Sequence, residues 1–216
     1  MKTRNLYLIR HGQSIYNLEN RFTGWKDVEL TSLGETQAKE AGELLSHIDF
    51  DYCYISKLKR AKNTLGHILE RIKQSPPIES NIALNERDYG NLIGQNKDEA
   101  AEQFGKDQVQ IWRRSFDTPP PGGESLKMTA ERTLPYYKQE ILPRVINSNN
   151  VIISAHGNSI RAIVMDIFNL SPEQILKTEI GWCEPWKISY DTSGNLSDYK
   201  IISRPSEPSK SHLYSK

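Results

Sequence analysis

Two short segments that lie far apart in the chain share one pattern, and this repetition constrains the fold more than any other feature. Residues 6–12 read Leu-Tyr-Leu-Ile-Arg-His-Gly, and residues 151–157 read Val-Ile-Ile-Ser-Ala-His-Gly. In each, an apolar run typical of a buried strand ends at His-Gly, before a loop or a helix. Open α/β sheets bind their ligands at the carboxyl ends of the strands. If the two strands are parallel neighbours, His11 and His156 face each other over one pocket.

The rest of the chain predicts a single α/β domain over residues 1–202. Apolar residues at helical spacing predict helices from residue 32 and from residue 56, with a strand over 51–55 between them. A further helix is expected from residue 125 to 145, kinked at Pro135, and a hairpin at the sheet edge over 186–202. Residues 203–216 are rich in Ser, Pro and Lys, and we expect a flexible polar tail there.

Composition excludes several classes of partner. The 216 residues include 28 Lys plus Arg and 27 Asp plus Glu, so no global basic field favours nucleic acid or an acidic membrane. Any anion site must be a local cluster of cations. The two cysteines, Cys53 and Cys183, form no CxxC pair, which fits a reducing compartment. With no apolar leader and no run of about 18 apolar residues, a cytoplasmic protein with no membrane partner is expected.

The residues around each histidine favour anion chemistry. Arg10 would hold an anionic group beside His11, and Gly12 allows the backbone to approach closely. His156 stands at the start of a helix, where free N–H groups favour an anion. A neutral imidazole is a competent nucleophile for phosphorus when its other nitrogen is fixed by a hydrogen bond. This arrangement predicts phosphoryl transfer through a phosphohistidine, in which the protein mainly supplies prepositioned cations.

Arg60 is the best candidate for a further cation at this pocket, because it lies near the start of the helix that follows the second strand. Lys57, Lys59 and Lys62 surround it. The alternative, a solvated charge on a helix surface, therefore stays open.

The motifs resemble a known family. Arg10-His11-Gly12 together with His156-Gly157-Asn158 resembles the histidine phosphatase superfamily. Longer matches, which extend over nearly the whole chain, narrow the resemblance to the cofactor-dependent phosphoglycerate mutases. These matches are Asn17, Asn20-Arg21-Phe22-Thr23-Gly24-Trp25, Leu58-Lys59-Arg60-Ala61, Leu84-Asn85-Glu86-Arg87, Tyr89-Gly90, Gly94, Asn96-Lys97 and Trp112-Arg113-Arg114.

The resemblance implies a three-layer αβα sandwich, with a mostly parallel central sheet, helices on both faces and an antiparallel edge strand. It also implies the interconversion of 3-phosphoglycerate and 2-phosphoglycerate, with 2,3-bisphosphoglycerate as the priming phosphoryl donor and no metal. The expected partner is this small-molecule substrate. A homodimer and a monomer both remain open.

By the same resemblance, His11 is the phosphorylated nucleophile, Glu86 donates and accepts the substrate proton, and His156 stabilises the transferring group. The residues implied at the reacting phosphoryl are Arg10, Asn17, Thr23, Gly24, Arg60 and Asn158. The residues implied at the substrate's other anionic groups are Arg87, Tyr89, Lys97, Arg113 and Arg114. Asp88 and Gly157 complete the predicted binding set.

Residue chemistry supports a second anion subsite. Phosphoglycerate is anionic at both ends, and Lys97 with Arg113 and Arg114 supplies a second cluster of cations. Adjacent helical arginines point about 100° apart, so one can hold substrate while the other pairs with protein. The alternative is a charge run on a helix surface. Glu86 needs partial burial to act as an acid near neutral pH.

Four features depart from the family pattern. Gln13 replaces the usual Glu, and Gly66 stands where Trp is frequent. The chain is shorter between Phe116 and Ser125, at the border of the active-site mouth. The Thr-Gly-x-Pro pattern is altered near residues 181–185.

Three other functions are alternatives to a mutase. A phosphomonoesterase of the same superfamily would pass the phosphoryl group to water, and it does not need the second anion subsite. A module that only binds a phosphorylated metabolite requires neither a nucleophile nor an acid. A metal hydrolase is disfavoured, because the five histidines show no metal-ligand spacing.

Overall fold

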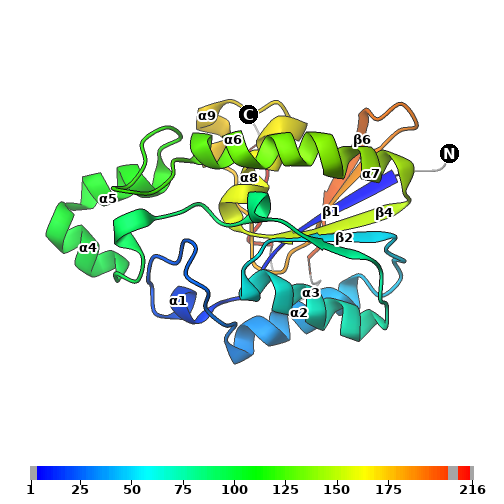
Figure 1. Ribbon diagram of the computed structural model, residues 1–216, viewed down its shortest axis with the longest axis horizontal. Coiled ribbons are helices and arrows are strands. Elements are labelled where there is room, and N and C mark those ends of the chain that lie inside the picture. Colours follow the sequence, from blue (N-terminus) through cyan, green and yellow to red (C-terminus); the bar gives the residue numbers. More distant parts are fainter. Residues whose placement is uncertain (1–3, 204–208, 215–216) are drawn as a thin grey trace.

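The computed structural model describes residues 4–203 and 209–214. In this part of the chain, six strands form one sheet in the order β3-β2-β4-β1-β5-β6 (Figure 1). The strands are β1 (Arg4–Arg10), β2 (Tyr52–Ile55), β3 (Ile78–Ser80), β4 (Asn150–Ala155), β5 (Trp186–Tyr190) and β6 (Leu196–Ile201). The first four strands in this order are parallel, whereas β5 is antiparallel to both β1 and β6. The predicted hairpin forms at the edge, and β3 is a strand that the sequence pattern did not predict.

The two strands that end at His-Gly are neighbours. β1 pairs with β4 in parallel, with Leu6 opposite Val151 and Arg10 opposite Ala155. The next residues of the two strands are His11 and His156. The prediction that both histidines emerge side by side at one sheet edge is confirmed.

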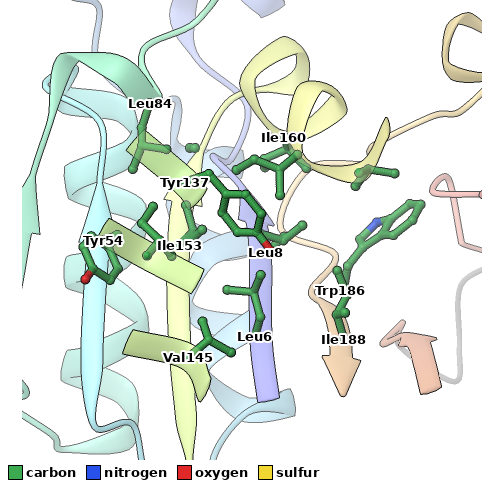
Figure 2. Packing of buried hydrophobic residues seen from close by; sticks show 14 of the residues in the cluster. Leu6, Leu8, Tyr54, Leu84, Tyr137, Val145, Ile153, Ile160, Trp186 and Ile188 are labelled. Carbon is green, nitrogen blue, oxygen red and sulfur yellow. The ribbon is translucent and has the colours of Figure 1, made fainter. Parts of the chain in front are cut away.

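Helices cover both faces of the sheet, which confirms the three-layer sandwich. Helices α2 (Ser32–Leu44) and α3 (Lys59–Ile72) lie on one face, and α6 (Leu126–Tyr136), α7 (Leu142–Asn147) and α8 (Gly157–Ile167) lie on the other (Figure 1). Side chains alternate along β1 because successive residues of a strand point to opposite faces. Tyr7 and Ile9 pack in the core on the α2 and α3 side. Leu6 and Leu8 pack in the other core, with Ile160 and Trp186 (Figure 2).

Two helices differ from the predicted ones. The helix expected from residue 56 begins at Lys59, because the Ser56 hydroxyl is hydrogen bonded to His156 and to the Leu58 N–H. The helix expected over 125–145 starts after Ser125, whose hydroxyl accepts from the Met128 N–H, and continues as α7 to Asn147. Its irregular turn is a π turn, η3 (Tyr137–Ile141), which begins two residues after Pro135 and ends two residues before Pro143. Proline has no N–H and its ring clashes with the carbonyl four residues earlier, so Pro143 disturbs the α-helical ladder at residue 139, within this turn.

A small cap lies beside the histidine end of the sheet. It contains α1 (Ile15–Leu18), α4 (Lys97–Phe104), α5 (Lys106–Arg114) and the turn η2 (Gly90–Leu92) (Figure 1). The cap has its own apolar cluster, which includes Phe22, Leu92, Ala100 and Val109. The turn η1 (Ile82–Leu84) and α9 (Pro172–Leu176) complete the described elements. The cap therefore brings Lys97 and Arg113, at the ends of α4 and α5, toward the histidines.

Part of the predicted tail contacts the domain. Glu179 and His212 exchange two backbone hydrogen bonds of 3.0 Å, and the Glu184 carboxylate accepts from the Lys210 and Ser211 N–H groups. Residues 204–208 and 215–216 lie outside the described residues, so the flexibility expected there stays a prediction. Over the described ranges, no helix has the length and apolar character needed to cross a membrane.

Candidate active site

His11 is held as a neutral imidazole with its proton on Nδ1. Its Nδ1 lies 2.6 Å from the Gly12 carbonyl oxygen, which can only accept, so Nδ1 carries the hydrogen and Nε2 carries the lone pair. Burial, then the Arg60 and Arg10 guanidiniums, hold the pKa of His11 well below its ordinary value. Gly12 is required here because a Cβ would lie 2.3 Å from the Gly34 carbonyl oxygen.

His156 faces His11, with ring centroids 5.0 Å apart and ring planes 58° apart. Its Nε2 is 2.7 Å from the Ser56 hydroxyl oxygen, which itself accepts from the Leu58 N–H. The buried Ser56 hydroxyl has no other acceptor among the described residues, so it donates its hydrogen to Nε2 and the ring proton resides on Nδ1. This Nδ1 is buried and has no hydrogen-bond partner among the described residues. Burial, then Arg60 and His11, lower the pKa of His156 well below its ordinary value.

Arg60 is fully buried beside the nucleophile. Its Nε donates to His11 Nε2 at 3.3 Å, and its Nη atoms donate to the Lys26 and Gly24 carbonyls at 3.0 and 2.8 Å. Burial lowers the pKa of Arg60 to about 10, so it remains a cation at neutral pH. The alternative of a solvated helix charge is wrong for Arg60.

Arg10 extends the cationic surface. Its Nη1 donates to the Ile180 carbonyl at 2.8 Å, and its guanidinium stacks over Trp182 at 5.4 Å. Its Nε is buried without a hydrogen-bond partner in the part of the chain that the structure describes.

Glu86 is buried, with 9% of its surface exposed. Its Oε1 accepts from the Arg87 N–H at 2.8 Å and from the Asn158 N–H, in the first turn of α8, at 3.1 Å. Its carbonyl oxygen accepts from Trp25 Nε1 at 2.6 Å and from Arg132 Nη2 at 2.9 Å. These bonds fix the carboxyl group close to the start of α8, where His156 is the N-cap residue.

The second cluster of cations lies at the cap. Burial, then Arg113 and Arg10, lower the pKa of Lys97 to about 8. Arg114 pairs with Glu179 at 2.8 Å, whereas the Arg113 side chain has no hydrogen bond or ion pair with any described residue. One arginine is paired with protein and the other is available to a ligand, as the helical spacing predicts.

One cavity of about 160 Å³ joins the two clusters. It is lined by Arg10, His11, Asn17, Arg21, Phe22, Thr23, Gly24, Arg60, Glu86, Arg87, Tyr89, Lys97, Arg113, Arg114, Gly157, Asn158, Arg161 and Glu179. Two predicted residues do not line it. His156 lies buried beside His11, and the Asp88 carboxylate accepts from the Gly90 N–H within its own loop.

Some residues at the cavity were not predicted. Arg161 follows Gly157 by four residues on α8 and therefore lies on the same helix face, a spacing that could have identified it. No comparable signal in the sequence marks Glu179. Within the described ranges, no group of three or more His, Cys, Asp or Glu side chains could hold a metal ion.

Comparison with known proteins defines the class. A family profile described as the histidine phosphatase superfamily (branch 1) matches residues 6–199. The chain belongs to this superfamily. A mycobacterial glucosyl-3-phosphoglycerate phosphatase of known structure has the same fold, with a TM-score of 0.78, 25% sequence identity and coverage of 92% of this chain and 97% of the other.

Closer relatives in sequence share one name. A protein of Afipia carboxidovorans is 57% identical over 83% of this chain and 88% of its own length. A protein of Xanthobacter autotrophicus is 52% identical over 89% of this chain and 96% of its own length. Both are named 2,3-bisphosphoglycerate-dependent phosphoglycerate mutase.

Proposed function

We propose that this chain is a 2,3-bisphosphoglycerate-dependent phosphoglycerate mutase of glycolysis and gluconeogenesis, acting in the cytoplasm without a metal. One observation carries the proposal: a single cavity is lined both by His11 with Arg60 and by a second cluster of cations that includes Lys97 and Arg113. A phosphoglycerate presents a phosphate and a carboxylate, so it needs both clusters of cations. The names of relatives above 50% identity support the same reading.

The residues fit an anionic priming donor. Arg10 and Arg87 line the cavity, and each has a buried Nε without a partner among the described residues. His156 Nδ1 is a third such donor beside His11. When bound, 2,3-bisphosphoglycerate supplies the phosphoryl group that charges the enzyme.

The proposed reaction begins at His11. Its Nε2 lone pair attacks the phosphorus of the bound phosphoryl donor. An N–P bond forms, and the bond from phosphorus to the donor's ester oxygen breaks. Glu86 gives its proton to that oxygen. In the return step, Glu86 takes the proton from the free hydroxyl of a bound monophosphoglycerate, and that oxygen attacks phosphorus while the N–P bond breaks.

The surrounding donors stabilise the charge on the transferring group. The Arg60 Nε–H donates a hydrogen bond to the His11 lone pair at 3.3 Å. As phosphorus approaches His11, this N–H must change its acceptor to a phosphoryl oxygen. Arg10 and the His156 Nδ1–H complete the set of donors to the equatorial oxygens. The depressed pKa of His11 keeps its nucleophilic nitrogen unprotonated at neutral pH.

The competing function is a phosphatase, in which water replaces the second hydroxyl. The 25% identical mycobacterial structure carries that name. The test mixes 3-phosphoglycerate, catalytic bisphosphoglycerate and enzyme, with and without a chelator. We expect 2-phosphoglycerate to form faster than free phosphate in both mixtures. Faster release of phosphate would favour the phosphatase, and loss of turnover that only a divalent ion restores would contradict metal-free catalysis.

His11→Ala should abolish turnover, with a loss of at least about 1,000-fold, because no other group in the cavity replaces the nucleophile. Bisphosphoglycerate with a labelled phosphoryl group should leave an acid-labile label on the parent protein and none on the variant. His47→Ala is the control, because His47 is exposed in the turn that follows α2. Equal labelling of parent and His11→Ala would place the phosphorylated residue elsewhere.

A further inference from the structure

An acidic residue lies within the cationic cavity without a part in the proposed chemistry. Over residues 4–203 and 209–214, Glu86 and Glu179 are the two carboxylates that line the cavity. Glu86 is assigned to proton transfer. Glu179 instead bridges two arginines, with Oε1 at 2.8 Å from Arg114 Nη1 and Oε2 at 2.8 Å from Arg161 Nη2.

Glu179 is ionised at neutral pH and accessible from the cavity. Burial opposes ionisation, but the Arg161 and Arg114 guanidiniums outweigh it and hold the pKa of Glu179 below its usual range. Its side chain is 36% exposed. A bound phosphoglycerate also carries a carboxylate, and this group would use the same two guanidiniums.

We propose that the Glu179 carboxylate competes with the ligand's carboxylate for Arg114 and Arg161. In this way it lowers the affinity of the cavity for phosphoglycerates. The proposal rests on the proposed function for the choice of ligand. A ligand carboxylate that binds Arg114 or Arg161 competes with a group already paired with both guanidiniums, whereas one that binds Arg113 meets no such pair among the described residues. Product release benefits from the competitor, because a cavity lined by this many cations would otherwise retain an anion strongly.

The main chain holds the competitor in place. Glu179 exchanges two backbone hydrogen bonds with His212, and Arg161 Nε donates to the Thr178 carbonyl at 3.0 Å. Arg161 therefore keeps an anchor when the Glu179 charge is removed. Glu179→Gln keeps the length of the side chain and one acceptor oxygen, so it tests the charge and little else.

The experiment measures binding by calorimetry on the full chain. For Glu179→Gln we expect the Kd of 3-phosphoglycerate to fall about tenfold at low ionic strength, and the difference to shrink in 0.5 M salt, where charges are screened over about 4 Å. Glycerol 3-phosphate has the phosphate but no carboxylate, and its Kd should change less than about twofold. Glu43→Gln is the matched control, because Glu43 pairs with Arg71 at 2.8 Å on the surface of α2 and α3 and does not line the cavity.

An unchanged or higher Kd of 3-phosphoglycerate in Glu179→Gln would overturn the proposal, because the carboxylate would then position the arginines instead of competing for them. Glu179→Ala must change the Kd in the same direction as Glu179→Gln. Equal tightening of both ligands would also contradict a role specific to the carboxylate. A parent protein without mutase activity would contradict the proposed function. The binding comparison would still be valid in that case, because calorimetry does not depend on turnover.

Discussion

At the scale of single residues, the site depends on where two protons reside. The Gly12 carbonyl fixes the His11 proton on Nδ1, and the Ser56 hydroxyl fixes the His156 proton on Nδ1. The sequence predicts the two histidines, because each follows a buried strand. It does not predict the role of Ser56, because a serine before an apolar helical pattern reads as a helix cap and its partner lies 100 residues away.

Ser56→Ala should lower kcat about tenfold with a smaller change in KM. The reason is that His156 loses the donor to Nε2 and can then place its proton on the wrong nitrogen. Steady-state kinetics in both directions measure the effect. Ser56→Thr retains a hydroxyl and should recover most of the activity. If Ser56→Ala matches the parent in kcat, the hydroxyl does not orient the imidazole.

At the scale of elements, a contact between backbones positions the nucleophile. The loop after β1 meets the first turn of α2, where a Cβ on Gly34 would lie 2.1 Å from the Gln13 carbonyl oxygen. The Thr31 hydroxyl accepts from the Gly34 N–H and caps the same turn. Helical periodicity predicts α2 from Ser32, but the contact depends on the three-dimensional approach of two segments, which no local pattern encodes.

Gly34→Ala should reduce the free energy of unfolding by about 1–3 kcal/mol and also lower turnover, because the added methyl group pushes α2 away from the His11 loop. Urea denaturation with activity assays measures both effects.

Gly66→Ala is the matched control on α3, where an added Cβ would meet nothing within 4 Å. Since alanine favours a helix over glycine, this variant should gain up to about 1 kcal/mol with turnover unchanged. A neutral Gly34→Ala would show that the two backbones separate easily.

At the scale of the whole molecule, parallel pairing of β1 with β4 gathers residues from opposite ends of the chain. The sequence predicts this sheet edge because each His-Gly motif follows a strand, and it predicts most of the cavity lining through the resemblance to a known family. It misses β3, a strand of three residues, which is too short to show a period. It also misses Glu179, because a lone acidic residue outside any motif gains meaning only when the fold places it between Arg114 and Arg161.

The paired histidines also affect global stability. Both imidazoles stay neutral in the folded protein, because burial lowers each pKa well below 6.5. The unfolded chain takes up those protons near pH 6.5, so it binds more protons than the folded state in this range. The free energy of unfolding should therefore fall by about 1–3 kcal/mol between pH 7.5 and pH 5.5.

Urea denaturation at the two pH values measures this loss. His156→Asn should make the dependence on pH shallower, whereas His47→Ala should leave it unchanged. A stability that rises as pH falls over this range would contradict the assignment of two neutral buried imidazoles.

The docking of residues 209–214 has a practical consequence for anyone preparing this protein. The backbone of His212 is paired with that of Glu179 at the cavity wall, and Tyr214 N–H donates to the Thr178 hydroxyl. A purification tag fused shortly after Tyr214 is therefore attached close to this cavity wall. β1 starts with Arg4 at the opposite end of the sheet (Figure 1), so a tag fused ahead of residue 1 is the safer choice for kinetic work.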